Sequence, residues 1–423
     1  MLLKKTAVLL SAAIMLSMTG CSGGSSSTST DTQAQTEAAV TTAAPQETTT
    51  TAAEPEKPKE LTLTPDSFDV KLIGRTLTEN GTLWLAHSAS GIEFTCTAKK
   101  LTINIKGDGA ASGDENNQAR FAVYVDGERT IDEMVDFDKK SFEIFSSESD
   151  VEKDVKIIKL SEPPMSSFGI ESLVIESDSD SPIEPVPEKE LMIEFIGDSI
   201  TCGYGVDDED LSHHFSTKTE DATKAYAYKT AQLLDADYSL VSYSGHGIIS
   251  GYTSKATEKN ESELVPPIYE QFSKTPTSDG FFNDDTPWDF SRYEPDYVVI
   301  NLGTNDGSYT GNDKDKAAEY EEGYLKFIKT VKSHYPDAYV ICILGTMGAN
   351  QLVSSIENAA AAYTEETGDT AISVLSLPQQ DRKKNGLAAD WHPTEATHTE
   401  TAELLAEYIR TLMNGEEPAN AAA

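Results

Sequence analysis

Five apolar runs after residue 190 alternate with segments of helical periodicity, and this alternation constrains the fold more than any other feature of the chain. The runs are apolar almost throughout, which is typical of strands buried on both faces, and they cover 192–196, 238–243, 297–301, 338–344 and 371–375. Helical patterns cover 224–234, 314–333, 352–366 and 399–413. This β-α-β order predicts a parallel sheet with helices on both faces, and ligands bind such sheets outside the carboxyl ends of the strands.

The region before this sheet, residues 61–187, has short strands in which apolar and polar residues alternate. Examples are 82–85, 92–96, 101–105, 121–125 and 142–145. Because such strands bury one face only, the pattern predicts a β-sandwich domain. A Pro-rich segment, 181–187, is predicted to be a short, stiff linker to the α/β domain over 188–415, and 416–423 to be a tail.

The first 60 residues have the features of an export signal and a tether. Lys4 and Lys5 precede an apolar stretch too short to span a bilayer, and it ends in Leu16-Ser-Met-Thr-Gly-Cys21. Residues 1–21 therefore resemble a bacterial lipoprotein signal, in which Cys21 is lipidated; an ordinary secretory signal is the alternative. Residues 22–60 are rich in Ser, Thr, Ala and Pro and contain no aromatic residue, which predicts a disordered tether.

Charge and cysteine content exclude several classes of function. The 423-residue chain has a formal net charge of −38, most of it carried by residues after 60. Binding of nucleic acid requires a basic face, and so does broad contact with anionic lipid, so neither is predicted; the expected membrane contact is the lipid anchor alone. The four cysteines, at 21, 96, 202 and 342, form no C-x-x-C pair. We therefore predict neither a disulfide scaffold nor a metal site.

Four strand or loop ends of the α/β domain carry the groups that acyl transfer needs. Gly197-Asp-Ser199 follows the first strand, Ser242-Tyr-Ser-Gly-His-Gly247 ends the second, and Asn301-Leu-Gly-Thr-Asn305 ends the third. Asp390-Trp-His392-Pro precedes the last helix. Together they offer a hydroxyl, backbone amides, a side-chain amide and an imidazole, which can serve as nucleophile, oxyanion donors and general base.

These four blocks resemble those of the SGNH (GDSL-type) hydrolases. The domain order, with Trp288-Asp-Phe-Ser-Arg292, is similar to carbohydrate esterase family two. The resemblance implies an α/β fold of three layers, α/β/α, preceded by a jelly-roll-like sandwich. It also implies a serine esterase that needs no cofactor and removes acetyl groups from polysaccharides such as xylan or mannan. We expect an exported monomer whose partner is an acetylated polysaccharide or oligosaccharide.

The resemblance also assigns the catalytic roles. Ser199 is the nucleophile and His392 the general base. The N–H groups of Ser199 and Gly247, with the side chain of Asn305, form the oxyanion hole. Asp390 is the acid that orients His392.

Two of these assignments have alternatives. Gly247 is preferred to Gly245 because it lies five residues after Ser242. Asp390 lies two residues before His392, whereas SGNH enzymes generally place the acid three residues before it, so a backbone carbonyl is the alternative orienting group.

Four further residues are candidates for substrate binding, each with a structural role as the alternative: His246, Trp288, Trp391 and Tyr204. The sandwich either binds carbohydrate or supports the active site. Two other functions remain open at this point: a surface glycan-binding protein with an inactive SGNH domain, and an esterase that acts on lipid or other acyl esters.

Overall fold

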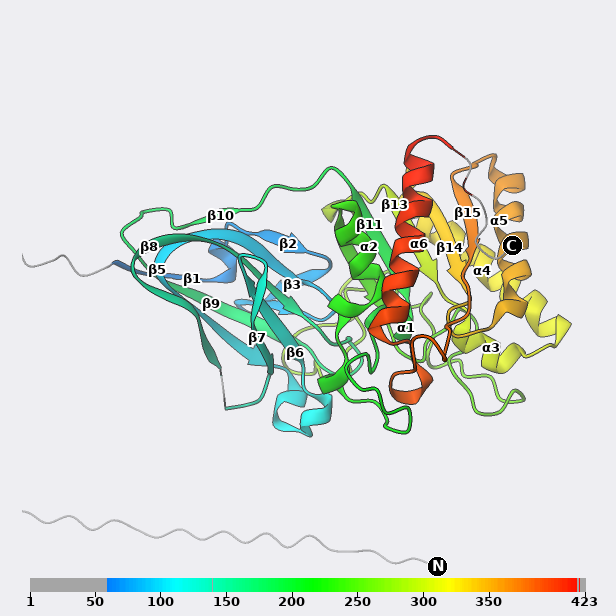
Figure 1. The fold of residues 1–423 in the computed structure, drawn as a ribbon, viewed down its shortest axis with the longest axis horizontal. Coiled ribbons are helices and arrows are strands. Elements are labelled where there is room, and N and C mark those ends of the chain that lie inside the picture. Colours follow the sequence, from blue (N-terminus) through cyan, green and yellow to red (C-terminus); the bar gives the residue numbers. More distant parts are fainter. Residues whose placement is uncertain (1–58, 139, 417, 419–423) are drawn as a thin grey trace, which may run out of the picture. The chain divides into compact units, whose positions relative to one another are not determined.

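The computed structural model describes residues 59–138, 140–416 and 418, which belong to one compact unit (Figure 1). The predicted signal, Cys21 and nearly all of the predicted tether lie outside the described residues. The tether prediction extended slightly too far, because the first strand already begins at Lys59. Within the described ranges, no helix is long and apolar enough to cross a membrane.

The N-terminal part is rich in β-strands, as predicted, and its ten strands form one antiparallel sheet. The strands are β1 (Lys59–Leu63), β2 (Lys71–Ile73), β3 (Thr76–Glu79), β4 (Thr82–Leu85), β5 (Gly91–Gly107), β6 (Arg120–Val125), β7 (Glu128–Met134), β8 (Ser141–Lys159), β9 (Phe168–Ser177) and β10 (Ile183–Pro185). The main path runs β3-β4-β9-β5-β8-β6-β7, while β1 pairs with β9, and β2 and β10 pair with β5.

Strand β5 differs from the sequence prediction, because the segments 92–96 and 101–105 are parts of a single strand of 17 residues. Its register against β8 shifts after Ala98 and again after Leu101. Such bulges bend a strand without ending it, so local turn residues do not mark the bend. The two halves of β5 therefore contribute to the same apolar core, for example through Phe94 and Ile103.

The C-terminal part contains the predicted parallel sheet, in the order β12-β11-β13-β14-β15. The strands are β11 (Met192–Gly197), β12 (Asp237–Ser242), β13 (Tyr297–Asn301), β14 (Tyr339–Leu344) and β15 (Ile372–Ser376), and every pairing is parallel. Each coincides with a predicted apolar run to within one or two residues. Strand β11 is thus buried between its neighbours β12 and β13, with its carboxyl end at Gly197.

Helices pack against both faces of this sheet (Figure 1). Phe195 of β11 packs with helices α2 (Tyr226–Leu234) and α6 (Glu395–Met413), while the next residue, Ile196, packs with α4 (Lys314–His334) and α5 (Val353–Thr367). This alternation is what a strand buried on both faces requires. Two short helices, α1 (Ser199–Cys202) and α3 (Thr304–Thr310), follow the carboxyl ends of β11 and β13.

Short 3₁₀ helices occur mainly in the connections. They are Pro65–Ser67, Gly109–Ser112, Glu115–Asn117, Thr217–Thr219, Ala222–Lys224, Phe290–Arg292, Asn350–Leu352 and Ala389–Trp391.

A buried ion pair joins the two sheets. Arg75, which follows β2, places its Nη2 3.5 Å from Oε2 of Glu194 in β11, and both side chains are fully buried. Arg75 Nη1 also donates to the carbonyls of Tyr269 and Gln271, at 2.5 and 3.0 Å. Glu194 accepts the hydroxyls of Tyr269 and Tyr293, each at 2.6 Å. The β-rich part and the parallel sheet therefore share one hydrogen-bonded charge network.

Candidate active site

Ser199 lies at the carboxyl end of strand β11, as the first residue of α1. The preceding residue, Asp198, caps this helix by accepting the N–H of Ile200 at 3.0 Å. Gly197 allows the tight exit from the strand, because a Cβ there would lie 2.0 Å from Oγ1 of Thr201. The hydroxyl of Ser199 is thus fixed at the edge of the sheet where parallel strands place their ligands.

His392 forms a hydrogen bond to Ser199, as predicted. Its Nε2 lies 2.8 Å from Ser199 Oγ, and its Nδ1 lies 3.2 Å from the carbonyl oxygen of Ala389. A carbonyl only accepts hydrogen bonds, so Nδ1 carries the proton and Nε2 presents a lone pair to the serine hydroxyl. Burial lowers the pKa of His392 to about 4, which keeps the imidazole neutral at neutral pH. The pair has the geometry of a nucleophile with its general base.

Asp390 does not occupy the position that the sequence predicted for it. Its carboxylate accepts the hydroxyl of Tyr204 at 2.5 Å and lies 2.9 Å from Nδ1 of His214. The backbone explains this: Asp390 and Trp391 have φ of +49° and +68°, so the side chain two residues before His392 points away from Nδ1. The backbone carbonyl of Ala389 takes the orienting position instead, which was the stated alternative.

Tyr204 connects Asp390 to the catalytic imidazole. Its ring stacks on that of His392, with centroids 4.0 Å apart and an interplanar angle of 21°. The hydroxyl of the same ring is held by Asp390. Tyr204, predicted as a weak substrate-binding candidate, therefore packs against the base.

The N–H of Gly247 is already engaged, which contradicts its predicted oxyanion role. It donates to the carbonyl of Glu263 at 3.1 Å. A Cβ on Gly247 would lie 2.1 Å from the carbonyl oxygen of Ser250, so close packing accounts for this glycine. By contrast, the N–H groups of Ser199 and Gly245 have no acceptor among the described residues. Gly245, with φ of +77°, is thus the better second donor.

Counting from the end of β12 at Ser242 would have favoured Gly245, since it lies only three residues beyond the strand. The sequence prediction instead chose Gly247, because its distance of five residues from Ser242 matches the spacing in the family.

Asn305 lies in α3 at the same edge of the sheet. Its Nδ2 donates to the carbonyl of His246 at 2.8 Å and lies 3.3 Å from Oδ2 of Asp198, the residue before the nucleophile. The neighbouring Asp306 accepts the N–H of Ile249 at 2.8 Å and those of the residues on either side of it, which fixes the loop after Gly247. Asn305 is therefore held close to the nucleophile, and its oxyanion role remains a prediction.

Two carboxyl groups behind this edge have raised pKa values. Burial raises the pKa of Asp198 to about 7 and that of Asp306 to about 6, each against several backbone hydrogen bonds that lower it.

The remaining substrate-binding candidates differ in exposure. Trp391, next to His392, is 50% exposed and lies against the guanidinium of Arg382. His246 is almost buried, with its Nδ1 2.9 Å from the carbonyl of Ser244. Trp288 is 7% exposed and belongs to an aromatic cluster with Trp84, Phe272 and Phe282. Trp288 therefore has the structural role that the sequence left open beside substrate binding.

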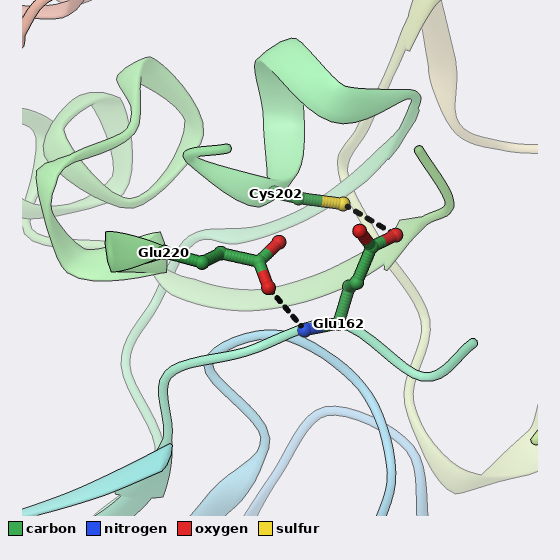
Figure 2. A group of neighbouring side chains, drawn as sticks. All are labelled: Glu162, Cys202 and Glu220. Carbon is green, nitrogen blue, oxygen red and sulfur yellow. Dashed lines mark hydrogen bonds between the residues drawn. The ribbon is translucent and has the colours of Figure 1, made fainter. Parts of the chain in front are cut away.

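One group of potential metal ligands occurs in the part of the chain that the structure describes: Glu162, Cys202 and Glu220 (Figure 2). All three are buried, and their ligand atoms lie within 4.8 Å of one another. Cys202 is the last residue of α1, so the group lies directly behind the nucleophile. Sequence analysis missed it because its members are far apart in the chain.

The chain matches two family descriptions in the order of its two parts. Residues 72–185 match the Carbohydrate esterase 2 N-terminal description, and residues 195–399 match the GDSL-like Lipase/Acylhydrolase family. Both parts of the chain are thus similar to known esterase families, the N-terminal part to carbohydrate esterase family 2.

Two curated relatives of the chain are informative. It is 30% identical over 328 residues to the cellulase/esterase CelE of Acetivibrio thermocellus, which covers 77% of the chain but only 37% of that protein's length. It is 24% identical to an acetylxylan esterase / glucomannan deacetylase of Cellvibrio japonicus, over 84% of the chain and 91% of that protein.

Solved structures share the fold over both parts. An acetyl xylan esterase (Est2A) from the rumen bacterium Butyrivibrio proteoclasticus has a TM-score of 0.74 at 22% identity, covering 84% of the chain and 99% of that structure. A family two carbohydrate esterase from Clostridium thermocellum, in complex with cellohexaose, has a TM-score of 0.68 at 27% identity, covering 82% and 99%.

Replacement of Asp390 tests which group orients the base. Loss of a true triad carboxylate costs about 10⁴-fold in kcat. Because Asp390 supports His392 through Tyr204 and through its charge, without a side-chain hydrogen bond to the imidazole, Asp390→Asn should remove about 1 kcal/mol, or roughly fivefold in kcat. His392→Ala is the reference for full loss. Steady-state kinetics on an aryl ester measure kcat of both variants. A thousandfold loss of kcat in Asp390→Asn would show that the Asp390 carboxylate is the group that orients His392.

The pH profile tests the protonation state of His392. The base must be neutral to accept the serine proton, and burial lowers the pKa of this imidazole to about 4. We therefore expect kcat/KM to hold down to about pH 5 and to fall as the pH passes through about 4, well below the ordinary histidine pKa of about 6.5. The measurement is kcat/KM between pH 3.5 and 8 in constant ionic strength. An acidic limb centred near 6.5 would contradict the buried, neutral imidazole.

Proposed function

We propose that this chain hydrolyses acetyl esters on polysaccharides through a serine acyl-enzyme. The observation that carries the proposal is the 2.8 Å contact between Ser199 Oγ and His392 Nε2, with His392 Nδ1 turned toward the carbonyl of Ala389. A protein that only binds glycan has no need for this tautomer-specific arrangement. The geometry therefore favours catalysis over the inactive-domain alternative.

In the proposed reaction, Ser199 Oγ attacks the acetyl carbonyl while His392 Nε2 takes its proton. The oxyanion that forms accepts hydrogen bonds from the N–H groups of Ser199 and Gly245, with Asn305 beside them. His392 then protonates the leaving oxygen of the sugar, which departs as a hydroxyl group, and the acetyl group remains on Ser199. Water, deprotonated by the same imidazole, releases acetate.

A neutral acetylated glycan fits the surroundings of this pair. The half-exposed ring of Trp391 lies next to His392 and can pack on the apolar face of a sugar. The strongly acidic chain disfavours anionic polymers such as pectin. The named activities of the relatives, acetylxylan esterase and glucomannan deacetylase, point to the same substrate class, so we propose xylan and mannan, acted on by a monomer.

Release of acetate from acetylated xylan and glucomannan tests the proposal. We expect acetate from both, abolished to background in Ser199→Ala, because no other nucleophile contacts His392 in the described part of the chain. Aryl acetate and aryl octanoate, assayed in parallel, separate a deacetylase from an esterase for long acyl chains. Glycan binding without acetate release by the wild-type protein would instead favour the inactive-domain function.

We further propose that the protein is exported and anchored at the cell surface through Cys21. Support comes from the sequence alone: two lysines, a short apolar stretch and Gly20-Cys21 at its end. In a bacterial host, Cys21→Ser should move the esterase from the membrane fraction to the soluble or secreted fraction, and labelled fatty acid should be incorporated only into the wild type. Equal fractionation of the two proteins would show that the segment is an ordinary secretory signal.

A further inference from the structure

Glu162 is a fully buried carboxylate that the catalytic steps above do not use. It lies in the segment after β8, which belongs to the β-rich part, yet its side chain reaches the catalytic edge of the parallel sheet (Figure 2). A buried carboxylate is costly unless its oxygens accept hydrogen bonds, so its partners indicate its purpose.

The two partners of Glu162 belong to the two elements that supply the oxyanion donors. Its Oε2 accepts the backbone N–H of Ser244 at 2.6 Å, and Ser244 immediately precedes Gly245. The same oxygen accepts the thiol of Cys202 at 3.7 Å. Cys202 ends helix α1, of which Ser199 is the first residue.

We propose that Glu162 is a positioning residue that sets the distance between the two backbone donors of the oxyanion hole. The inference rests on the proposed esterase function and deepens it. One oxygen atom holds both the turn before Gly245 and the helix that begins at Ser199. Oxyanion donors act at 2.7–3.1 Å, and a displacement of about 1 Å at a reacting centre can cost about 10²-fold in rate.

Glu162 itself is held by groups outside the active site. Its N–H donates to Oε2 of Glu220 at 3.0 Å, and its carbonyl accepts Nζ of Lys159 at 2.9 Å. Lys159, the last residue of β8, also donates to the carbonyl of Ser161 at 2.5 Å. Lys159 of the β-rich part and Glu220 of the loop after α1 thus fix the backbone of Glu162, and the carboxylate transmits that position to the catalytic edge.

The same contacts argue against a metal ion as the purpose of the Glu162, Cys202 and Glu220 group. The Oε2 of Glu162 already has two donors, and Oε2 of Glu220 has one. Burial raises the pKa of both carboxyl groups, and the nearby Lys159 ammonium opposes that shift. A proton on one of the two carboxyl groups, together with this ammonium, can therefore balance the charge without an ion.

The experiment compares Glu162→Ala and Glu162→Gln with Glu220→Gln, a matched control that is equally buried but makes no side-chain hydrogen bond to either oxyanion element in the described residues. We expect Glu162→Ala to lower kcat on an aryl acetate by about 10²-fold with KM little changed, because the donors act on the transition state. Glu162→Gln keeps an acceptor oxygen for Ser244 and should recover most of kcat. Glu220→Gln should lose thermal stability while kcat stays near wild type.

Inhibition by a phenylboronic acid gives a second readout that needs no turnover. A boronate adduct on Ser199 places an oxygen at the oxyanion position, so its affinity should fall in Glu162→Ala by about the same factor as kcat. Boronate affinity reports the geometry of the oxyanion donors even if the wild-type protein releases no acetate. Absence of acetate release would then contradict the proposed function but not the positioning role of Glu162.

Three outcomes would overturn the inference. The first is an equal loss of kcat in Glu162→Ala and Glu220→Gln at equal melting temperature. The second is boronate affinity that Glu162→Ala leaves unchanged. The third is wild-type activity that is lost on dialysis against a chelator and regained with zinc, which would make the group a metal site.

Discussion

The buried ion pair between Arg75 and Glu194 is the interaction on which the two-part architecture depends. Moving either charge out of water costs several kcal/mol, and removing one partner of such a pair typically costs about 3–5 kcal/mol. Arg75 belongs to the β-rich part, and Glu194 to strand β11 of the parallel sheet. Arg75 also lies over the rings of Tyr269 and Trp288. Neither part can bury its own charge alone, which explains why both form one compact unit.

The same dependence extends to the catalytic edge. Arg120 of β6 lies 2.7 Å from Asp207 and donates to the carbonyl of Lys218, so a strand of the β-rich part holds the loop after α1. Glu162 reaches farther, to Ser244. The sequence left open whether the N-terminal domain binds carbohydrate or supports the active site. These contacts from the β-rich part to the loops beside the active site favour the supporting role.

Features set by periodicity were predictable, and features set by backbone conformation were not. The five parallel strands were found because strands buried on both faces must be apolar throughout. Ser199 and His392 were found because each belongs to a recognisable sequence block, Gly-Asp-Ser and Asp-Trp-His-Pro. Asp390 was misplaced because its left-handed φ of +49° turns the side chain away, which residue spacing does not reveal. Gly247 was misassigned because the acceptor of its N–H, the carbonyl of Glu263, comes from a later segment of the chain.

In a triad, one carboxylate both orients the imidazole and stabilises its charged form, and the position of Asp390 separates these two tasks. The Ala389 carbonyl selects the tautomer of His392, since Nδ1 must donate to it. A neutral carbonyl stabilises the imidazolium less than a carboxylate would, so the pKa of the buried ring stays low. The charge of Asp390 still raises that pKa from nearby, while its hydrogen bond to Tyr204 keeps the stacked ring in place. Orientation and electrostatic support therefore come from adjacent residues, the carbonyl of Ala389 and the side chain of Asp390.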